Sequence, residues 1–515
     1  MIFLNRERFI MLTQSCIILA IVVYLCGMLY IGISFSKKNS NTDDFYLGGR
    51  TLGPFVTAMS AEASDMSSYL LMGLPGLAYL SGLADVGWTV IGLAAGTYLN
   101  WLIVSRKIRR YSHAVGAITI PDFFAKRYGD KKNMLTAIAA VIIIIFFIPY
   151  TASGFSACGK LFSTLFGMNY MVAMIISAVI IVTYCAFGGF LAVSTTDLIQ
   201  SIIMTIALFI VIGFGVVQAG GSAAVIENAK ALPGYLSFTQ TYVASAGSAS
   251  PYTPLTIVST LAWGLGYFGM PHILLRFMAI KDEEKLALSR RVASIWVVIS
   301  MAVAILIGII GYGMTQTGVI PALEDSETVI IQIAGYLSKF GIFPALVAGV
   351  IMAGILAATM STADSQLLTA ASGISQNIIQ DFFGIKLKEQ TAMIIARCTV
   401  IAIAVIGIFL ARDPNSSVFQ IVSFAWAGFG ATFGPVVLCA LFWRRSNKWG
   451  ALAGMISGGI MIFVWKFGIA KLGGAFNIYE LLPAFIVGCI FNVVVSLLTP
   501  APEEEITKIF DQVNK

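Results

Sequence analysis

The chain has 515 residues, of which 58% are hydrophobic and only 11% charged, and its mean hydropathy is +0.89. Soluble globular proteins carry roughly a quarter charged residues, so this composition excludes that class and indicates a polytopic protein of the cell membrane. The formal net charge of +7 could suggest a nucleic-acid partner. In a membrane protein, however, basic residues first report orientation, and the sequence contains no nucleic-acid-binding motif.

A helix needs about 20 predominantly apolar residues to cross the hydrocarbon core, and segments of that length predict about thirteen spans. They are expected at 10–35, 53–79, 84–104, 134–156, 170–187, 198–217, 255–270, 292–312, 344–369, 392–410, 418–443, 451–467 and 481–498. The first segment is too long for a cleavable signal peptide and lacks a small-residue cleavage site. We therefore expect it to remain in the bilayer as a span.

Basic residues gather in alternate loops, after the first, third, seventh and eleventh predicted spans. They are Lys37, Lys38, Arg50, Arg106, Lys107, Arg109, Arg110, Lys126, Arg127, Lys131, Lys132, Arg276, Lys281, Lys285, Arg290, Arg291, Arg444, Arg445 and Lys448. The loop after the eighth span is instead acidic, and the connection over 220–252 is nearly uncharged. Because positive loops face the cytoplasm, we expect the N-terminus outside and the tail 501–515 inside.

Two predicted spans carry glycine and proline in mid-span. The second contains SAEASDMSSYLLMGLPG (60–76), and the seventh contains AWGLGYFGMPH (262–272). Such breaks free backbone groups that only protein or a water-filled cavity can receive. The two breaks are five spans apart, as an inverted repeat of five spans produces, and transporters of this design bind ion and substrate between the breaks. Glycine-mediated helix packing is the alternative, and it fits the seventh span alone.

The predicted fold is therefore all-α, with a five-plus-five inverted-repeat core and discontinuous helices at the site. Its parts are a first helix outside the core (1–36), a first repeat (51–217), an inverted second repeat (253–443), two additional helices (449–500) and a cytoplasmic tail (501–515).

Carboxylates inside a span are costly and mark an ion path or a paired charge. Asp65 lies at the first break and is the stronger candidate. Glu62 falls nearer the cytoplasmic end, where we expect it to pair with Arg50 or reach water. Asp197, at the predicted start of the sixth span, could line an ion exit or cap the helix.

The ninth predicted span contains LAATMSTADSQLL (356–368). Ser361 and Thr362 follow Ala358 by one turn, so two hydroxyl oxygens can lie beside a backbone carbonyl. Hard cations bind such oxygen clusters, and a monovalent ion needs less formal charge than calcium does. Ordinary hydrogen bonds between helices would explain the same residues equally well.

Aromatic residues near the breaks favour a compact organic substrate. Trp263 and Tyr267 are spaced i and i+4, which places them on one helical face, and Tyr150 follows Pro149 in the fourth span. Aromatic walls with a few polar anchors are typical of small-molecule sites. The seven cysteines are scattered and suggest neither disulfides nor a metal site, and the two histidines, His113 and His272, lie far apart.

Six stretches resemble the sodium/solute symporter family, and within it the sodium/proline branch. They are SAEASDMSSYLLMGLPG, FGGFLAVSTTDLIQ, WGLGYFGMPHILLRFM, MSTADSQLL, SFAWAGFGATFGPVVL and GALAGMISG. The resemblance implies sodium-coupled uptake of L-proline by alternating access, with sodium as coupling ion, no cofactor, no enzymatic activity and no obligate protein partner. Another small amino acid or a carboxylate as solute, or a proton as coupling ion, remain alternatives.

The resemblance also implies roles for individual residues. For sodium it implies the backbone carbonyls of Ala63, Met66 and Ala358 and the hydroxyls of Ser361 and Thr362, with Asp65, Arg50 and Asp197 in ion affinity or coupling. For the substrate it implies Ser67, Tyr69, Tyr150, Trp263, Tyr267 and Pro271. Three positions depart from the proline branch: Ser68-Tyr69 replaces Gly-Trp, and Met270 replaces glutamine. Tyr69 keeps an aromatic wall and adds a hydroxyl.

Overall fold

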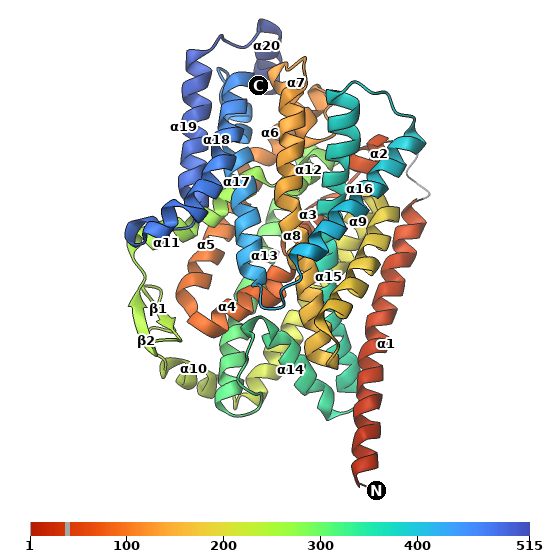
Figure 1. The fold of residues 1–515 in the computed structure, drawn as a ribbon, viewed down its shortest axis with the longest axis vertical. Helices are drawn as coiled ribbons and strands as arrows, with labels where there is room; N and C mark the ends of the chain where they lie inside the picture. Colours follow the sequence, from red (N-terminus) through yellow and green to blue (C-terminus); the bar gives the residue numbers. More distant parts are fainter. Residues whose placement is uncertain (1, 37–41, 515) are drawn as a thin grey trace.

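The computed structural model describes residues 2–36 and 42–514, and helices account for most of them (Figure 1). Ten helices among the described residues are long and apolar enough to cross a membrane. The two termini lie at opposite ends of the bundle, and helix α1 runs along one side of it (Figure 1). The chain is therefore a polytopic, all-α membrane protein, as the sequence predicts.

The first half of the chain contains ten helices. They are α1 (Ile2–Ser36), α2 (Thr42–Leu47), α3 (Pro54–Asp65), α4 (Leu74–Ser81), α5 (Leu83–Leu99), α6 (Ser105–Ala114), α7 (Ile120–Tyr128), α8 (Met134–Phe166), α9 (Tyr170–Gln218) and α10 (Ser222–Lys230). Gly189 interrupts α9 with φ 68° and ψ 175°, so this one long element holds two of the predicted spans. The boundary between them lies at this glycine because a left-handed φ costs it little.

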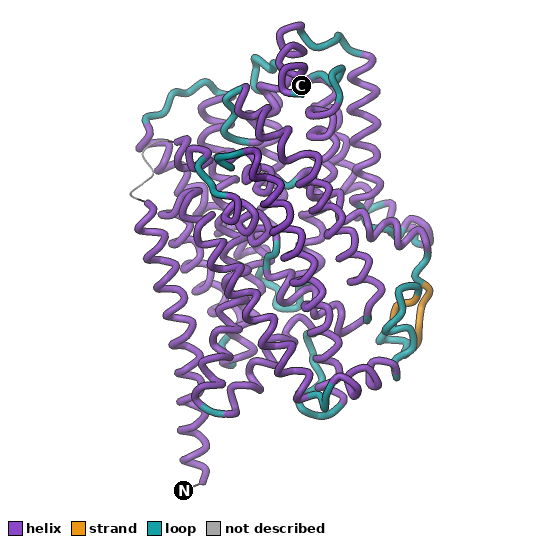
Figure 2. The backbone as a smooth tube through the Cα atoms, turned by 180° about the vertical axis from the view of Figure 1, so that it is seen from behind, coloured by secondary structure: helices purple, strands orange, loops and turns teal. Residues whose placement is uncertain are grey.

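The second half begins with a short antiparallel hairpin of β1 (Gln240–Val243) and β2 (Ser248–Pro251), which lies at the edge of the bundle (Figure 2). The helices that follow are α11 (Pro254–Leu261), α12 (Pro271–Ala279), α13 (Leu286–Gln316), α14 (Val329–Leu337), α15 (Ile342–Ser372), α16 (Glu389–Leu410), α17 (Val418–Phe442), α18 (Lys448–Phe467), α19 (Leu481–Leu498) and α20 (Glu504–Val513).

Both predicted breaks are present. Helix α3 ends at Asp65, Met66 leaves the helical conformation (φ −77°, ψ 66°), and a π-helical turn over Tyr69–Gly73 leads into α4. In the second break, a 3-10 helix over Ala262–Gly269 and an extended Met270 separate α11 from α12. The chain runs from α3 down to α4 but from α11 up to α12, so the two broken helices run in opposite directions (Figure 1).

Glycines in the second break also permit close packing. A Cβ on Gly264 would lie 2.2 Å from the carbonyl oxygen of Gly92 on α5, and one on Gly266 would lie 1.9 Å from Nε1 of Trp426 on α17. Both explanations offered for these glycines therefore hold. They accompany a broken helix, and they let two neighbouring helices approach it.

The count of thirteen spans stays a prediction. Ten helices meet the length and hydropathy expected of a span, whereas the broken segments 54–81 and 254–279 and the first part of α9 do not meet them as single helices. The orientation also stays a prediction, and Lys37 and Lys38 lie outside the described residues. The basic helix α6 and the C-terminus do lie at one end, and the hairpin β1–β2 lies toward the other (Figure 1).

Candidate ion and substrate site

The end of α3 meets the middle of α15 at the first break. Ser361 Oγ lies 2.8 Å from the carbonyl oxygen of Ala63 and 3.2 Å from that of Ala358. All three residues are fully buried. Since one hydroxyl carries one proton, Ser361 donates to only one of the two carbonyls at a time. The break thus gathers three oxygens of the kind that hard cations bind.

Thr362 adds a fourth oxygen next to Ser361. Its side chain is 2% exposed, and its hydroxyl has no hydrogen-bond partner in the part of the chain that the structure describes. An unpaired buried hydroxyl costs about 1–3 kcal/mol. Met66, the remaining predicted ligand, is the first residue beyond α3 and is 1% exposed. A bound cation would pair the free hydroxyl.

Aromatic rings from distant segments pack together beside these oxygens. Trp263 stacks on Tyr69 with ring centroids 5.8 Å apart and on Tyr479 at 5.0 Å. Phe419, at the start of α17, lies 5.6 Å from Tyr69 and 5.5 Å from Trp263. Sequence reasoning missed Phe419 and Tyr479. We name these four rings the aromatic cluster, and such a wall of rings is typical of small-molecule sites.

A cavity of about 360 Å³ adjoins the aromatic cluster, and its wall includes Phe419 and Gly73. Its charged lining residues are Lys160 on α8 and Glu324, Asp325 and Glu327, which precede α14. Lys160 and Glu327 are the pair nearest α17. Their side chains form an ion pair of 2.7 Å, and Glu327 also accepts the backbone N–H groups of Val418 and Phe419, each at 3.0 Å. Phe419 therefore belongs to the aromatic cluster and also lines this cavity.

Asp65 connects the break in α3 to two of the predicted substrate tyrosines. The hydroxyl of Tyr267 donates to Asp65 Oδ2 at 2.6 Å, and that of Tyr150 donates to the Asp65 carbonyl at 3.3 Å. Ser67 holds the turn, because its hydroxyl oxygen accepts the N–H of Tyr69 at 3.2 Å. The hydroxyl of Tyr69 is buried and has no partner among the described residues. It is thus available to a substrate.

Pro271 is buried and occupies the first position of α12, directly after the extended Met270. Proline suits this position because its fixed φ matches the helix and its missing N–H would have no partner there. Trp426 on α17 contacts the same break. Its indole N–H donates to the carbonyl of Trp263 at 2.8 Å, and its ring lies edge-on to Tyr267 at 5.0 Å.

Arg276 is not a loop residue, so the prediction that placed it in a basic loop is wrong. It lies inside α12, is 1% exposed, and its Nη2 forms an ion pair of 3.2 Å with Asp197 Oδ2. Ser60 on α3 donates to the same carboxylate oxygen at 2.6 Å, and Nη2 also donates to Ser365 Oγ at 2.5 Å. Asp364, also fully buried, lies beside Ser365.

These five residues form a polar network among α3, α9, α12 and α15. Asp197 lies about two turns beyond Gly189, inside the second part of α9, so it does not cap that helix. The role of Asp197 in ion exit stays a prediction. The network joins helices from both halves of the chain. Its members on α15 lie within two turns of the candidate ion ligands on that helix.

Arg50 connects the ends of α6 and α12 with the segment that precedes α7. Its guanidinium donates to the backbone carbonyls of Met278 at 2.7 Å and Ala117 at 2.5 Å, and to Ser112 Oγ at 3.1 Å. Glu62 does not pair with it. Glu62 is 1% exposed and accepts the indole N–H of Trp101 at 2.8 Å, so the expectation that it would pair with Arg50 or reach water is wrong.

No group of three His, Cys, Asp or Glu side chains that could hold a metal ion occurs within the described ranges. The candidate ion ligands are instead neutral hydroxyl and carbonyl oxygens, with Asp65 nearby. Few formal charges suit a monovalent ion better than a divalent one.

Comparison with known proteins identifies relatives over nearly the whole chain. The model of the Sodium:solute symporter family matches residues 45–458. The "Osmoregulated proline transporter OpuE" of Bacillus subtilis is 40% identical, covering 97% of this chain and 98% of that protein. A "Sodium/proline symporter" of Haemophilus influenzae is also 40% identical, with 97% of each chain covered, and one of Escherichia coli is 39% identical over 95% of this chain and 94% of that protein.

Solved structures show the same fold. A Na⁺-coupled sialic acid symporter in a substrate-bound outward-open state superposes with a TM-score of 0.76 at 17% identity, covering 95% of this chain and 99% of that one. A nucleobase-cation-symport-1 family transporter in a closed conformation superposes with a TM-score of 0.54 at 15% identity, covering 91% of this chain and 98% of that one.

Proposed function

The chain belongs to the Sodium:solute symporter family and is a transporter, not an enzyme, and we propose that it imports L-proline together with sodium. The observation that carries the proposal is the meeting of α3 and α15, where Ser361 contacts Ala63 and Ala358 beside the unpaired Thr362. Its relatives at about 40% identity are named as proline transporters, which supports proline as the solute.

Sodium would bind to the carbonyls of Ala63, Met66 and Ala358 and the hydroxyls of Ser361 and Thr362. In this arrangement the Ser361 proton turns away from the ion, so that its oxygen lone pairs coordinate. Asp65 directly precedes Met66. Its negative charge lowers the local electrostatic potential, which favours a cation. Its bond to Tyr267 fixes the carboxylate and links ion binding to the substrate side.

Proline would bind between the break in α3 and the aromatic cluster. Its ring suits the apolar faces of Trp263, Tyr69 and Phe419, and hydroxyls of Tyr69 and Tyr150 offer polar anchors. Ser67 and Pro271 shape the two breaks that border this space. A compact, partly apolar zwitterion needs such a mixture of rings and a few hydrogen-bonding groups.

Coupling follows from the position of the ion between the two repeats, taken as residues 51–217 and 253–443. An ion that bridges α3 and α15 favours the conformation in which these helices touch, and only such a differential preference can shift the balance of states. The N-terminus would lie outside and the C-terminus in the cytoplasm, as the basic loops indicate. Sodium would leave its site toward Asp197. Arg50 would hold together the helix ends that it contacts.

The membrane potential adds to the driving force. Moving one positive charge inward through 100 mV supplies about 2.3 kcal/mol. At about 1.4 kcal/mol per factor of ten, this energy corresponds to roughly fiftyfold accumulation before the sodium gradient contributes.

Equilibrium binding tests the identity of solute and ion. Radiolabelled L-proline is added to the purified protein in sodium or in potassium at equal ionic strength, with unlabelled amino acids and small carboxylates as competitors. Sodium-dependent binding that only proline or close analogues displace supports the proposal. Displacement by an unrelated solute, or equal binding in potassium, would contradict it.

A further inference from the structure

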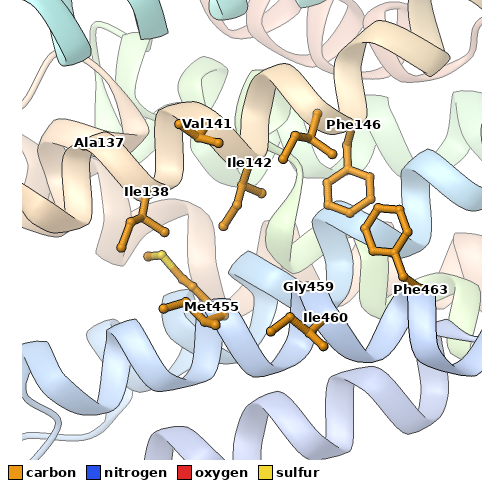
Figure 3. A pocket seen from close by; sticks show the side chains of 11 residues that line it. Ala137, Ile138, Val141, Ile142, Phe146, Met455, Gly459, Ile460 and Phe463 are labelled. Carbon is orange, nitrogen blue, oxygen red and sulfur yellow. The ribbon is translucent and has the colours of Figure 1, made fainter.

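Helices α8 and α18 enclose an apolar groove of about 360 Å³, shown in Figure 3. Every residue that lines it is apolar. Ala137, Ile138 and Met455 lie at one end, and Phe146 and Phe463 meet at the other, with ring centroids 5.9 Å apart (Figure 3). The Phe146–Phe463 contact therefore closes the groove at that end.

The groove opens outward. Val141 and Ile145 on α8 are 47% and 45% exposed, and Ile456 and Ile460 on α18 are 45% and 58% exposed. Both helices belong to the ten that are long and apolar enough to cross a membrane. Hydrocarbon is the natural neighbour of such a face, so an acyl chain can enter the groove directly from the bilayer.

Basic residues lie beyond the open end. Lys132 is separated from α8 only by Asn133, and Lys448 is the first residue of α18. The neighbouring Lys131 lies 3.9 Å from Glu503. Phe146 and Phe463 are in contact, and this contact relates the positions of the two helices. Lys132 precedes Phe146 by as many residues as Trp449 precedes Phe463, so Lys132 and Trp449 lie at the same level. The Lys448 ammonium lies 5.1 Å from the centre of the Trp449 ring, and Trp449 is 45% exposed. Exposed tryptophan and lysine at a helix end are typical of the headgroup region.

We propose that this groove binds an anionic phospholipid, with one acyl chain between α8 and α18 and the phosphate held at the level of Lys132 and Lys448. From Ala137 to Phe146 the groove follows about 13 Å of helix at 1.5 Å per residue, which accommodates the part of an acyl chain nearest the headgroup. Juxtamembrane lysines attract anionic lipid, so they select the headgroup.

A second copy of the chain fits the groove less well. Copies in one membrane are related by an axis along its normal, which brings the same end of each together. Lys132 and Lys448 of both copies would then face each other, and like charges repel. A lipid phosphate carries the complementary charge.

The closed end of the groove also contacts α17. Phe146 packs against Phe424 and Phe429 of α17, with centroids 5.9 and 5.7 Å apart. A Cβ on Gly428 would lie 2.2 Å from the Phe146 ring, so α17 fits closely against it. Helix α17 carries Phe419 of the aromatic cluster. A lipid in the groove would thus pack against side chains that contact this helix.

Native mass spectrometry of the full chain in detergent tests the proposal without reference to transport. The protein is titrated with phosphatidylglycerol or with phosphatidylcholine of the same acyl chains, and bound lipids are counted. We expect phosphatidylglycerol to bind at a concentration at least fivefold lower. The pair Lys132→Ala and Lys448→Ala should bring it to the level of phosphatidylcholine, and Val141→Trp, which fills the groove, should weaken both lipids.

Matched variants outside the groove are Lys471→Ala, at an exposed lysine, and Ile406→Trp, at a lipid-facing position 47% exposed on α16. Both should bind lipid as the unchanged chain does. If Val141→Trp does not fold, Ala137→Leu narrows the groove more gently. Equal binding of the two lipids by the unchanged chain, unaltered binding after the groove is filled, or a dimer that Val141→Trp abolishes would overturn the proposal.

Discussion

The hydroxyl oxygen of Ser361 lies 2.8 Å from the carbonyl oxygen of Ala63, although 298 residues separate them in the chain. This contact joins the end of a broken helix to the middle of an unbroken one. It places a cluster of neutral oxygens between the two halves of the chain, where an ion can stabilise one relative arrangement of these halves.

Replacing Thr362 by alanine should raise the sodium concentration for half-maximal proline uptake at least about tenfold, or about 1.4 kcal/mol of ion binding. The unfolding temperature should change little, because the hydroxyl has no hydrogen bond to lose among the described residues. Thr359→Ala is the control, since that hydroxyl donates within its own helix to Ile355 at 3.0 Å. Normal transport by Thr362→Ala at low sodium would remove Thr362 from the ion site.

Asp65→Asn should also raise the sodium requirement, because the variant keeps the size of the side chain but loses its charge. Tyr267→Phe should have a smaller effect in the same direction, since it frees the carboxylate from its 2.6 Å hydrogen bond. Glu62→Gln is the matched control, because an amide oxygen can still accept the Trp101 indole N–H. Sodium-dependent uptake is measured for the three variants. The increase in the sodium requirement should be largest for Asp65→Asn, smaller for Tyr267→Phe and smallest for Glu62→Gln. A larger effect at Glu62 than at Asp65 would reverse the assignment.

Tyr69→Phe should weaken proline binding about five- to tenfold, which is roughly 1–1.4 kcal/mol and within the usual range for a hydrogen bond. The ring and its stacking on Trp263 remain, so the sodium dependence should be unchanged. Stability should stay equal or rise, because a buried hydroxyl without a partner in the described structure is removed. Competition binding measures the change, and Tyr479→Phe, whose hydroxyl donates to the Ser423 carbonyl at 2.8 Å, serves for comparison. Unchanged proline affinity would place the Tyr69 hydroxyl outside the substrate site.

Arg276→Met should destabilise the protein by about 3–5 kcal/mol, since removal of one partner leaves a buried charge uncompensated. Asp197→Leu alone should also destabilise it. The double variant should be less unstable than the sum of the two, because the interaction between contacting residues is then removed as a pair. Denaturant unfolding of the purified protein in detergent measures this cycle. Additive effects would show that Arg276 is compensated chiefly by Asp364 and Ser365 instead of Asp197.

Much of the architecture was predictable from the sequence because long apolar segments and their interruptions are local properties. Glycine and proline in the segments around Met66 and Met270 predicted both broken helices correctly. Ser361 and Thr362 were identified as candidate ion ligands from their spacing after Ala358. The structure brings Ser361 against Ala63, a contact between distant segments that no local pattern specifies.

Other features depend on tertiary packing and were missed. Arg276 looked like a loop residue because it follows a glycine-rich span, but α12 continues to Ala279 and buries it against Asp197. Phe419 and Tyr479 join the aromatic cluster from late in the chain, and neither forms a spacing pattern with Trp263. Aromatic residues make up 12% of the sequence, so their abundance hid the few that form this cluster.

Uptake of radiolabelled L-proline into proteoliposomes that contain the purified protein tests the central claim most directly. An inward sodium gradient is compared with an equal potassium gradient and with a proton gradient. The account predicts concentrative uptake with sodium alone, increased by a potential that is negative inside. Uptake driven by protons without sodium, or no proline uptake by protein that still binds sodium, would contradict sodium-coupled proline transport.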